Sequence, residues 1–192
     1  KDCDALTSIT LGNKVSEIGS FAFYRAYHVK TRNLPSTLSS IGEGAFALTD
    51  RTLRMDENNE YFVFESGCLR GKDKKDLYFG NTKAVINHTV NHILPYAFYG
   101  NTGLNRLILP DSVETIGESA FAHSFLSSLV IPSSVRSMDS MAFAECERLT
   151  DITYQGTKAE WNQIDFGDSV FSSIPAENVI CKDFVFDLIE EN

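Results

Sequence analysis

Two histidines four positions apart are the closest approach of this sequence to a catalytic or metal-binding motif. His88 and His92 have the spacing of the zinc-binding pattern His-Glu-x-x-His, but Thr89 stands where that pattern places its catalytic glutamate. The segment is expected to be extended, and four residues of extended chain separate the two rings by about 13 Å, too far for one zinc ion. We therefore predict no metal site here.

Other known binding and catalytic motifs are incomplete or absent in this sequence. The segment that begins at Asp56 starts like a calcium loop, but Tyr61 and Gly67 stand where such a loop requires glycine and glutamate. The run from Gly42 to Ala47 matches a dinucleotide-binding loop only locally. No nucleophile elbow of the Gly-x-Ser-x-Gly type and no phosphate-binding loop occur in the sequence. The sequence predicts a protein that is not an enzyme and carries no cofactor.

Composition excludes further classes of protein. The 192 residues include 17 Lys and Arg against 26 Asp and Glu, and the resulting net charge of −9 repels nucleic acids and anionic membranes. No apolar run approaches the roughly 20 residues of a membrane-spanning helix, so neither a nucleic-acid partner nor membrane insertion is expected. The four cysteines, at positions 3, 68, 146 and 181, stand singly, and we expect free or buried thiols rather than a zinc site or a disulfide scaffold.

A repeat of about 23 residues organises the chain. The dipeptide Ala-Phe recurs so that successive phenylalanines are 23, 52, 23 and 22 residues apart. An isoleucine or methionine stands five residues before each phenylalanine, and valine or leucine stands eight before it. Upstream lies a phrase such as Leu104-Asn-Arg-Leu107-Ile-Leu109-Pro110, whose alternation predicts a short strand that ends at the proline. The phenylalanines are Phe23, Phe46, Phe98, Phe121 and Phe143.

One such unit buries too few apolar side chains to offset the entropy of ordering it, so the units must stack. Stacking at a strand spacing of about 4.8 Å also brings the Ala-Phe rings into a column. We predict an α/β fold of the solenoid kind, β-rich with little helix, with short parallel strands on one face and irregular or short-strand segments on the other. About six turns are expected over 1–148, including a degenerate hairpin-bearing turn near 52–80.

These residues resemble the BspA-like class of bacterial leucine-rich repeats over roughly residues 3–183. In that likeness the run from Lys72 to Asp76 is a solvated hairpin tip, and 149–192 form a capping element and tail. Trp161 is expected to pack in this cap rather than to stack on a ligand, and the acidic end from Asp187 is expected to be a linker or a frayed end. Because Cys3 begins a phrase that Cys146 repeats, we expect the chain to be an excerpt whose upstream segment and secretion signal are missing.

The strand phrase also predicts an outward face, since alternate residues point away from the core. Thirteen residues before each phenylalanine stand Thr10, Asn33, Val85, Ile108 and Val130. Fifteen residues before stand Ser8, Thr31, Lys83, Arg106 and Ser128. The last three residues of the first set form an apolar stripe flanked by Lys83 and Arg106, with Ser128 beside Val130. This stripe is the best partner site in the sequence, although β-branched residues also simply suit exposed strands.

The sequence and the family resemblance together favour a non-catalytic, adhesion-type module that binds protein. The resemblance implies a bacterial protein at the cell surface or outside the cell, with a host matrix or mucosal protein as its partner. A structural spacer or stalk that binds nothing is the alternative. Glycan binding ranks lower, because the predicted strand face offers no exposed aromatic side chain.

Overall fold

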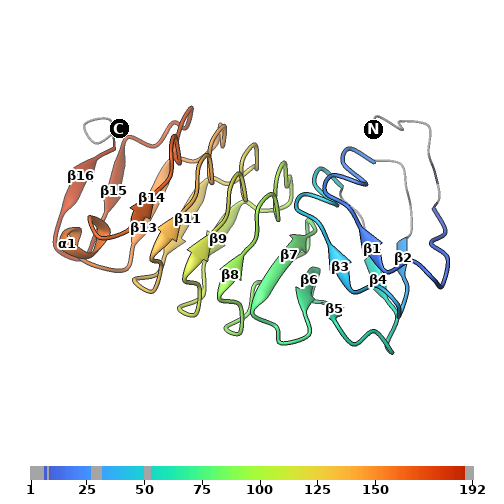
Figure 1. Cartoon of the computed structure of the whole chain (residues 1–192). Coiled ribbons are helices and arrows are strands. Elements are labelled where there is room, and N and C mark those ends of the chain that lie inside the picture. The colour runs from blue at the N-terminus through green and yellow to red at the C-terminus, as the bar shows by residue number, and fades with distance from the viewer. Residues whose placement is uncertain (1–6, 8, 27–31, 50–52, 189–192) are drawn as a thin grey trace.

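The computed structural model describes residues 7, 9–26, 32–49 and 53–188. The chain winds into an elongated solenoid whose coils follow one another from the N-terminal to the C-terminal end, with strands along its sides and turns between them (Figure 1). The only helix among the described residues is α1 (Lys158–Trp161), a single turn. The predicted β-rich leucine-rich-repeat solenoid is confirmed.

One side of the solenoid carries the strands predicted from the leucine phrase. Two of them, β9 and β11, join three strands of the C-terminal segment in one sheet of order β16-β15-β13-β11-β9, which is parallel except for the antiparallel pair β15 and β16. We call it the leucine sheet. Its strands are β9 (Arg106–Ile108), β11 (Ser128–Ile131), β13 (Asp151–Tyr154), β15 (Asn178–Ile180) and β16 (Val185–Asp187). Nearer the N-terminal end, β2 (Arg32–Leu34) and β4 (Leu53–Met55) pair separately in parallel.

The opposite side carries two-residue strands at the isoleucine positions of the repeat. Ile93 pairs with Ile116, and Ile116 with Met138, so equivalent residues of successive coils lie side by side as the repeat predicts. These strands are β8 (His92–Ile93), β10 (Thr115–Ile116), β12 (Ser137–Met138) and β14 (Asp165–Phe166). They continue through the hairpin strands into a seven-stranded sheet, while β1 (Glu17–Ile18) and β3 (Ser40–Ile41) form a separate pair.

Two hairpins interrupt the regular coils. Ser66 and Gly67 join the first pair of strands and have φ of 50° and 75°, the positive values that a two-residue turn needs to match the strand twist. The second hairpin turns at residues 72–75, whose side chains are exposed, so the charged run is a solvated tip as expected. The three strands are β5 (Phe62–Glu65), β6 (Cys68–Gly71) and β7 (Asp76–Gly80).

Arg70 ties this hairpin unit to the coil that follows. The side chain is 1% exposed and forms an ion pair with Glu65. Its guanidinium also donates to the Asn87 Oδ1 at 2.8 Å and to the Thr89 hydroxyl at 3.0 Å. A buried guanidinium requires such partners, since an unpaired charge in the core is strongly destabilising.

Each coil turns at its phenylalanine through two residues in the left-handed region. The residues two before and two after the phenylalanine have φ between 51° and 66° in six successive turns. Their N–H groups and that of the phenylalanine then point at the next coil. Around Phe121, these three groups donate to carbonyl oxygens of the turn around Phe143 at N···O distances of 3.0, 2.8 and 2.9 Å. This triplet of hydrogen bonds is the main link between coils at this edge.

The predicted column of phenylalanine rings is also present. In the C-terminal half, successive rings lie 4.9, 5.1 and 5.5 Å apart, with interplanar angles of 4°, 2° and 8°. This part of the column comprises Phe98, Phe121, Phe143 and Phe171. Phe23 and Phe46 stack in the same way at 5.4 Å, but Phe79 of β7 is tilted by 53° against Phe46. The hairpins therefore bend the column, and the core divides into two clusters there.

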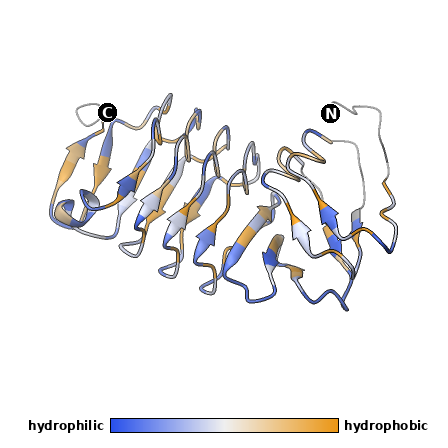
Figure 2. Cartoon of the chain, viewed as in Figure 1, coloured by the Kyte–Doolittle hydropathy of each residue, from blue (hydrophilic) through white to orange (hydrophobic). Residues whose placement is uncertain are grey.

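The C-terminal end is closed on one side by α1 and β16. Trp161 is 3% exposed and packs against Phe171 and Phe186, at ring distances of 6.2 and 5.4 Å, which confirms its role in the cap. The expectation of a free acidic tail is wrong for Asp187, which ends β16, and for Leu188, which is 8% exposed. The cause is the alternation of the segment, whose apolar residues turn inward, and hydrophobic residues mark β15 and β16 in Figure 2.

Candidate partner-binding face

The outward side of the leucine sheet carries a row of mostly aliphatic residues, one from each of five neighbouring strands. Strand pairing places these residues opposite one another across the sheet. The row consists of Ile108, Val130, Thr153, Ile180 and Val185. Ile108, Ile180 and Val185 are 55%, 49% and 55% exposed, while Val130 and Thr153 are half-buried. Their chain neighbours on the strands point into the core, so this face is open to a partner.

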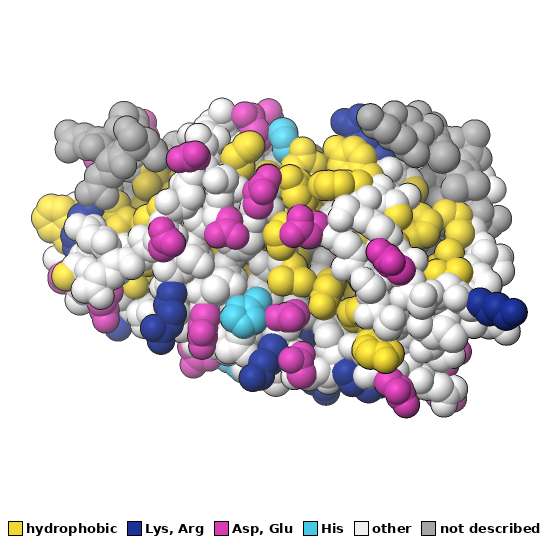
Figure 3. Space-filling view, viewed as in Figure 1, with side chains coloured by type: hydrophobic (Ala, Val, Ile, Leu, Met, Phe, Trp, Pro, Cys, Tyr) yellow, Lys and Arg dark blue, Asp and Glu magenta, His cyan; other side chains and the backbone are white. Residues whose placement is uncertain are grey.

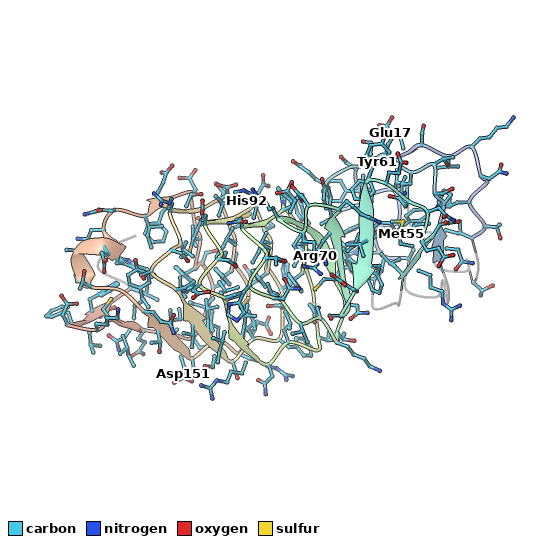
Figure 4. All side chains as sticks on the ribbon, turned by 90° about the horizontal axis from the view of Figure 1, so that it is seen from below. Glu17, Met55, Tyr61, Arg70, His92 and Asp151 are labelled. Carbon is cyan, nitrogen blue, oxygen red and sulfur yellow. The ribbon has the colours of Figure 1, made fainter. Side chains whose placement is uncertain are left out.

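A second outward row runs parallel to the first and is polar. Arg106, Ser128 and Asp151 lie opposite one another on β9, β11 and β13, and Asn178 pairs with Asp187 on β15 and β16. Charge therefore changes along the sheet from basic at β9 to acidic at β13 and β16. Figure 4 shows Asp151 at the leucine-sheet side of the molecule, with His92 and Tyr61 at the opposite side.

Some residues predicted for this face lie outside the leucine sheet. Lys83 and Val85 are both exposed, Val85 by 64%, but they lie in an irregular segment outside any strand. The Val85 N–H donates to the Ser66 carbonyl of the preceding hairpin unit at 2.9 Å, and β9 pairs only with β11 within the described chain. Asn33 is exposed on β2, in the separate N-terminal pair of strands. Ser8 and Thr31 lie outside the described residues.

Sequence reasoning missed the part of the row that the cap supplies. Thr153, Ile180 and Val185 extend it by three strands beyond Val130. Ile180 follows a buried valine in a strand parallel to β13, so extending the alternation past 148 would have found it. Val185 carried no such signal, because its strand runs antiparallel and outside the repeat.

The two histidines of the zinc-like spacing each contact a residue of the following coil. His88 contacts Asp111 at 2.9 Å and His92 contacts Thr115 at 3.0 Å, which are the neighbours that the repeat register predicts. Among the residues that the structure describes, no group of three or more histidines, cysteines and carboxylates gathers as a metal site would require.

The cysteines are buried rather than activated. Cys68, Cys146 and Cys181 are buried and form no disulfide with one another, and Cys3 lies outside the described residues. Burial raises the pKa of the Cys68 thiol to about 11 and also raises the pKa of Cys146. A reactive thiol needs the opposite shift, so these groups pack as small apolar side chains.

A β-solenoid with a repeated outward strand face is the architecture of a leucine-rich-repeat module. The family model of the BspA type leucine rich repeat region matches residues 1–80 and 75–188 in six copies, and the chain belongs to that family. A search of curated proteins found no match. No helix in the described part of the chain is long and apolar enough to cross a membrane.

Solved structures share the fold. The pneumococcal vaccine antigen PcpA aligns with a TM-score of 0.74 and 23% identity, over 88% of this chain and 42% of that one. A leucine-rich repeat protein from Bacteroides ovatus ATCC 8483 gives 0.55 and 21%, over 95% and 51%. One from Eubacterium ventriosum ATCC 27560 gives 0.51 and 16%, over 88% and 64%. The chain thus spans less than two thirds of each of these proteins.

Proposed function

We propose that this chain is a non-catalytic, adhesion-type module of a bacterial surface or secreted protein, and that it binds a protein through the outward face of the leucine sheet. The observation that carries the proposal is the row from Ile108 to Val185, with three aliphatic side chains about half exposed. A contiguous apolar surface with a polar rim is the usual composition of a protein–protein interface.

The charges around the row favour a protein partner of mixed charge. Arg106 stands at one end and Asp151 near the middle, so no single sign dominates the face. The net charge of −9 opposes nucleic acids. No outward position of the leucine sheet among the described residues is aromatic, which weighs against glycan stacking on this face. Host matrix and mucosal proteins are the partner class that the family resemblance favours.

Binding of the immobilised domain to a panel of matrix and mucin proteins tests the proposal. The test variant is Ile108→Asp, Val130→Asp, and the matched control is Tyr61→Asp, which changes a 52% exposed side chain on the opposite side of the solenoid. A third variant, Val85→Asp, measures whether the irregular segment contributes. Circular dichroism checks that all variants are folded.

Saturable binding that the double variant loses and the Tyr61→Asp control retains is the expected result. Equal binding by both variants would move the site away from the leucine sheet. If no protein of the panel binds the parent domain, the spacer or stalk becomes the better account.

A further inference from the structure

The turn around Phe171 has the same backbone conformation as earlier turns, but it donates no hydrogen bonds to a following turn within the described chain. Ser169 and Ser173 have φ of 57° and 55°, the same conformation as the donating residues of the earlier turns. The N–H groups of Ser169, Phe171 and Ser173 nevertheless find no acceptor among the described residues. The same three N–H groups link the turns around Phe23, Phe98, Phe121 and Phe143 to the coil that follows, whereas here they have no partner among the described residues.

The strand beside this turn is unpaired on the same side. β14 is an edge strand of the seven-stranded sheet and pairs only with β12 within the described chain. Asp165 and Gly167 donate backward to the coil of β12, at 2.9 and 2.8 Å. Because alternate residues of a strand address opposite neighbours, the N–H and C=O of Phe166 face away from the solenoid. Donors and an acceptor without partners among the described residues thus lie in the single segment 166–173.

The leucine sheet, by contrast, is carried two strands further, by β15 and β16, which lie beyond β14 at the C-terminal end (Figure 1). At this end the leucine sheet therefore projects two strands beyond β14, and we call the recess beside β14 and the last turn the C-terminal step. A pocket of about 330 Å³ lies in it, lined by apolar side chains of α1, β14, the last turn and the end of β16. These side chains are Trp161, Phe166, Val170, Phe171 and Leu188.

Acidic groups border this step. Asp168 lines the apolar pocket, and Asp165 and Asp139 line an adjoining groove of about 290 Å³ together with Glu118. No lysine or arginine lines either space in the described chain. Acidic side chains are also spread across the face of the molecule in view in Figure 3. A segment that fills the step therefore meets negative charge.

We propose that this C-terminal step binds an extended peptide with apolar side chains flanked by lysine or arginine, which adds one strand and one turn to the solenoid. Its N–H groups bond to the free side of β14, and its carbonyls accept from Ser169, Phe171 and Ser173. Strand addition supplies the backbone bonds, and the pocket selects the side chains. The step admits one segment, whereas a whole second solenoid would meet β15 and β16.

The chain itself supplies a probe of the right shape. Residues 90–103 contain β8 and its turn and have no lysine, arginine or carboxylate side chain. In the folded protein the carbonyls of Ala97 and Tyr99 already accept hydrogen bonds, from the Gly80 N–H at 2.9 Å and from the Leu48 N–H at 3.4 Å. We would add this peptide, with two lysines or two glutamates at each end, to the full chain and measure binding by calorimetry. Amide exchange of Ser169, Phe171 and Ser173 is recorded by NMR in the same samples.

The expected result is that the lysine-flanked peptide binds at least about tenfold more tightly than the glutamate-flanked one and slows exchange at the three amides. The variant Asp165→Lys, Asp168→Lys is expected to reverse the preference. Its matched control, Glu17→Lys, Glu43→Lys, makes the same change in net charge at the other end of the solenoid and is expected to leave the preference unchanged.

Three results would overturn the proposal. One is no heat of binding from either peptide at about 1 mM, the weakest affinity of interest. Another is binding that leaves the three amides unprotected. The third is protection of these amides in the free protein together with a mass that rises with concentration, which would make a second copy of the chain the occupant.

Discussion

Replacing Phe121 by leucine tests whether stacking of the phenylalanine column stabilises the solenoid beyond simple burial. Phe121 is fully buried, with the rings of Phe98 and Phe143 on its two faces at 4.9 and 5.1 Å. Leucine keeps an apolar side chain in this space but has no ring, so both stacked contacts are lost. Phe98→Leu is the matched variant, because Phe98 is equally buried and, among the described residues, only the ring of Phe121 stacks on it, at 4.9 Å.

The expected magnitude follows from the number of contacts. A stacked aromatic pair contributes about 0.5–1.5 kcal/mol beyond its buried area, so Phe121→Leu should lower the free energy of unfolding by about 1–3 kcal/mol and Phe98→Leu by about half as much. In a chain of this length, 1 kcal/mol corresponds to about 2–4 °C in Tm. A loss of 2 kcal/mol therefore lowers Tm by about 4–8 °C.

Urea unfolding followed by circular dichroism measures these differences, provided that the dependence on urea concentration is unchanged. The double variant Phe98→Leu, Phe121→Leu sharpens the test. The two residues share one stack, so the loss in the double variant should fall short of the sum of the single losses by about 0.5–1.5 kcal/mol. Additivity within about 0.3 kcal/mol would refute the stacking argument, because the shared contact would then contribute nothing.

Three further changes have expected outcomes. Gly80→Ala places a methyl group well within van der Waals distance of the Phe98 ring and should lower the free energy of unfolding in urea by about 1–3 kcal/mol. An unchanged free energy of unfolding would show that the ring moves aside freely. Asn59→Ala removes a buried amide that donates to the Leu38 carbonyl at 2.8 Å and should cost about 2–3 kcal/mol by the same measurement. The Cys68 thiol ionises near pH 9 when unfolded and about pH 11 when folded, so its contribution to stability is constant below pH 9 and is lost as the pH rises to 11. Unfolding of the parent chain and of Cys68→Ala between pH 8 and pH 11 checks this, and parallel pH profiles would contradict it.

The repeat register was predictable because equivalent residues must lie one strand spacing apart in any stacked array. It predicts the pairing of Leu107 with Leu129 and the contact of His88 with Asp111, and both are present. At Val85 the side chain is exposed as the alternation predicts, but the segment forms no strand, and its N–H donates to the Ser66 carbonyl of the hairpin turn. The register fails at Val185, where an antiparallel strand follows its own alternation and not the repeat.

The left-handed turns were beyond prediction because glycine, the residue that signals them, occupies only two of the twelve positions, Gly44 and Gly100. Each of the others costs about 1–2 kcal/mol in this conformation. The three inter-coil hydrogen bonds of a turn contribute about 0.5–1.5 kcal/mol each, so a turn is close to neutral once the next coil is stacked on it.

The turn around Phe171 differs in this respect from the turns around Phe23, Phe98, Phe121 and Phe143. Two serines there hold the left-handed conformation without the three bonds that offset its cost elsewhere. The cap must stabilise this turn through packing, with Trp161 against Phe171. A peptide that supplies the missing acceptors finds the donors already oriented, and it therefore gains the bonds without the conformational cost of forming the turn.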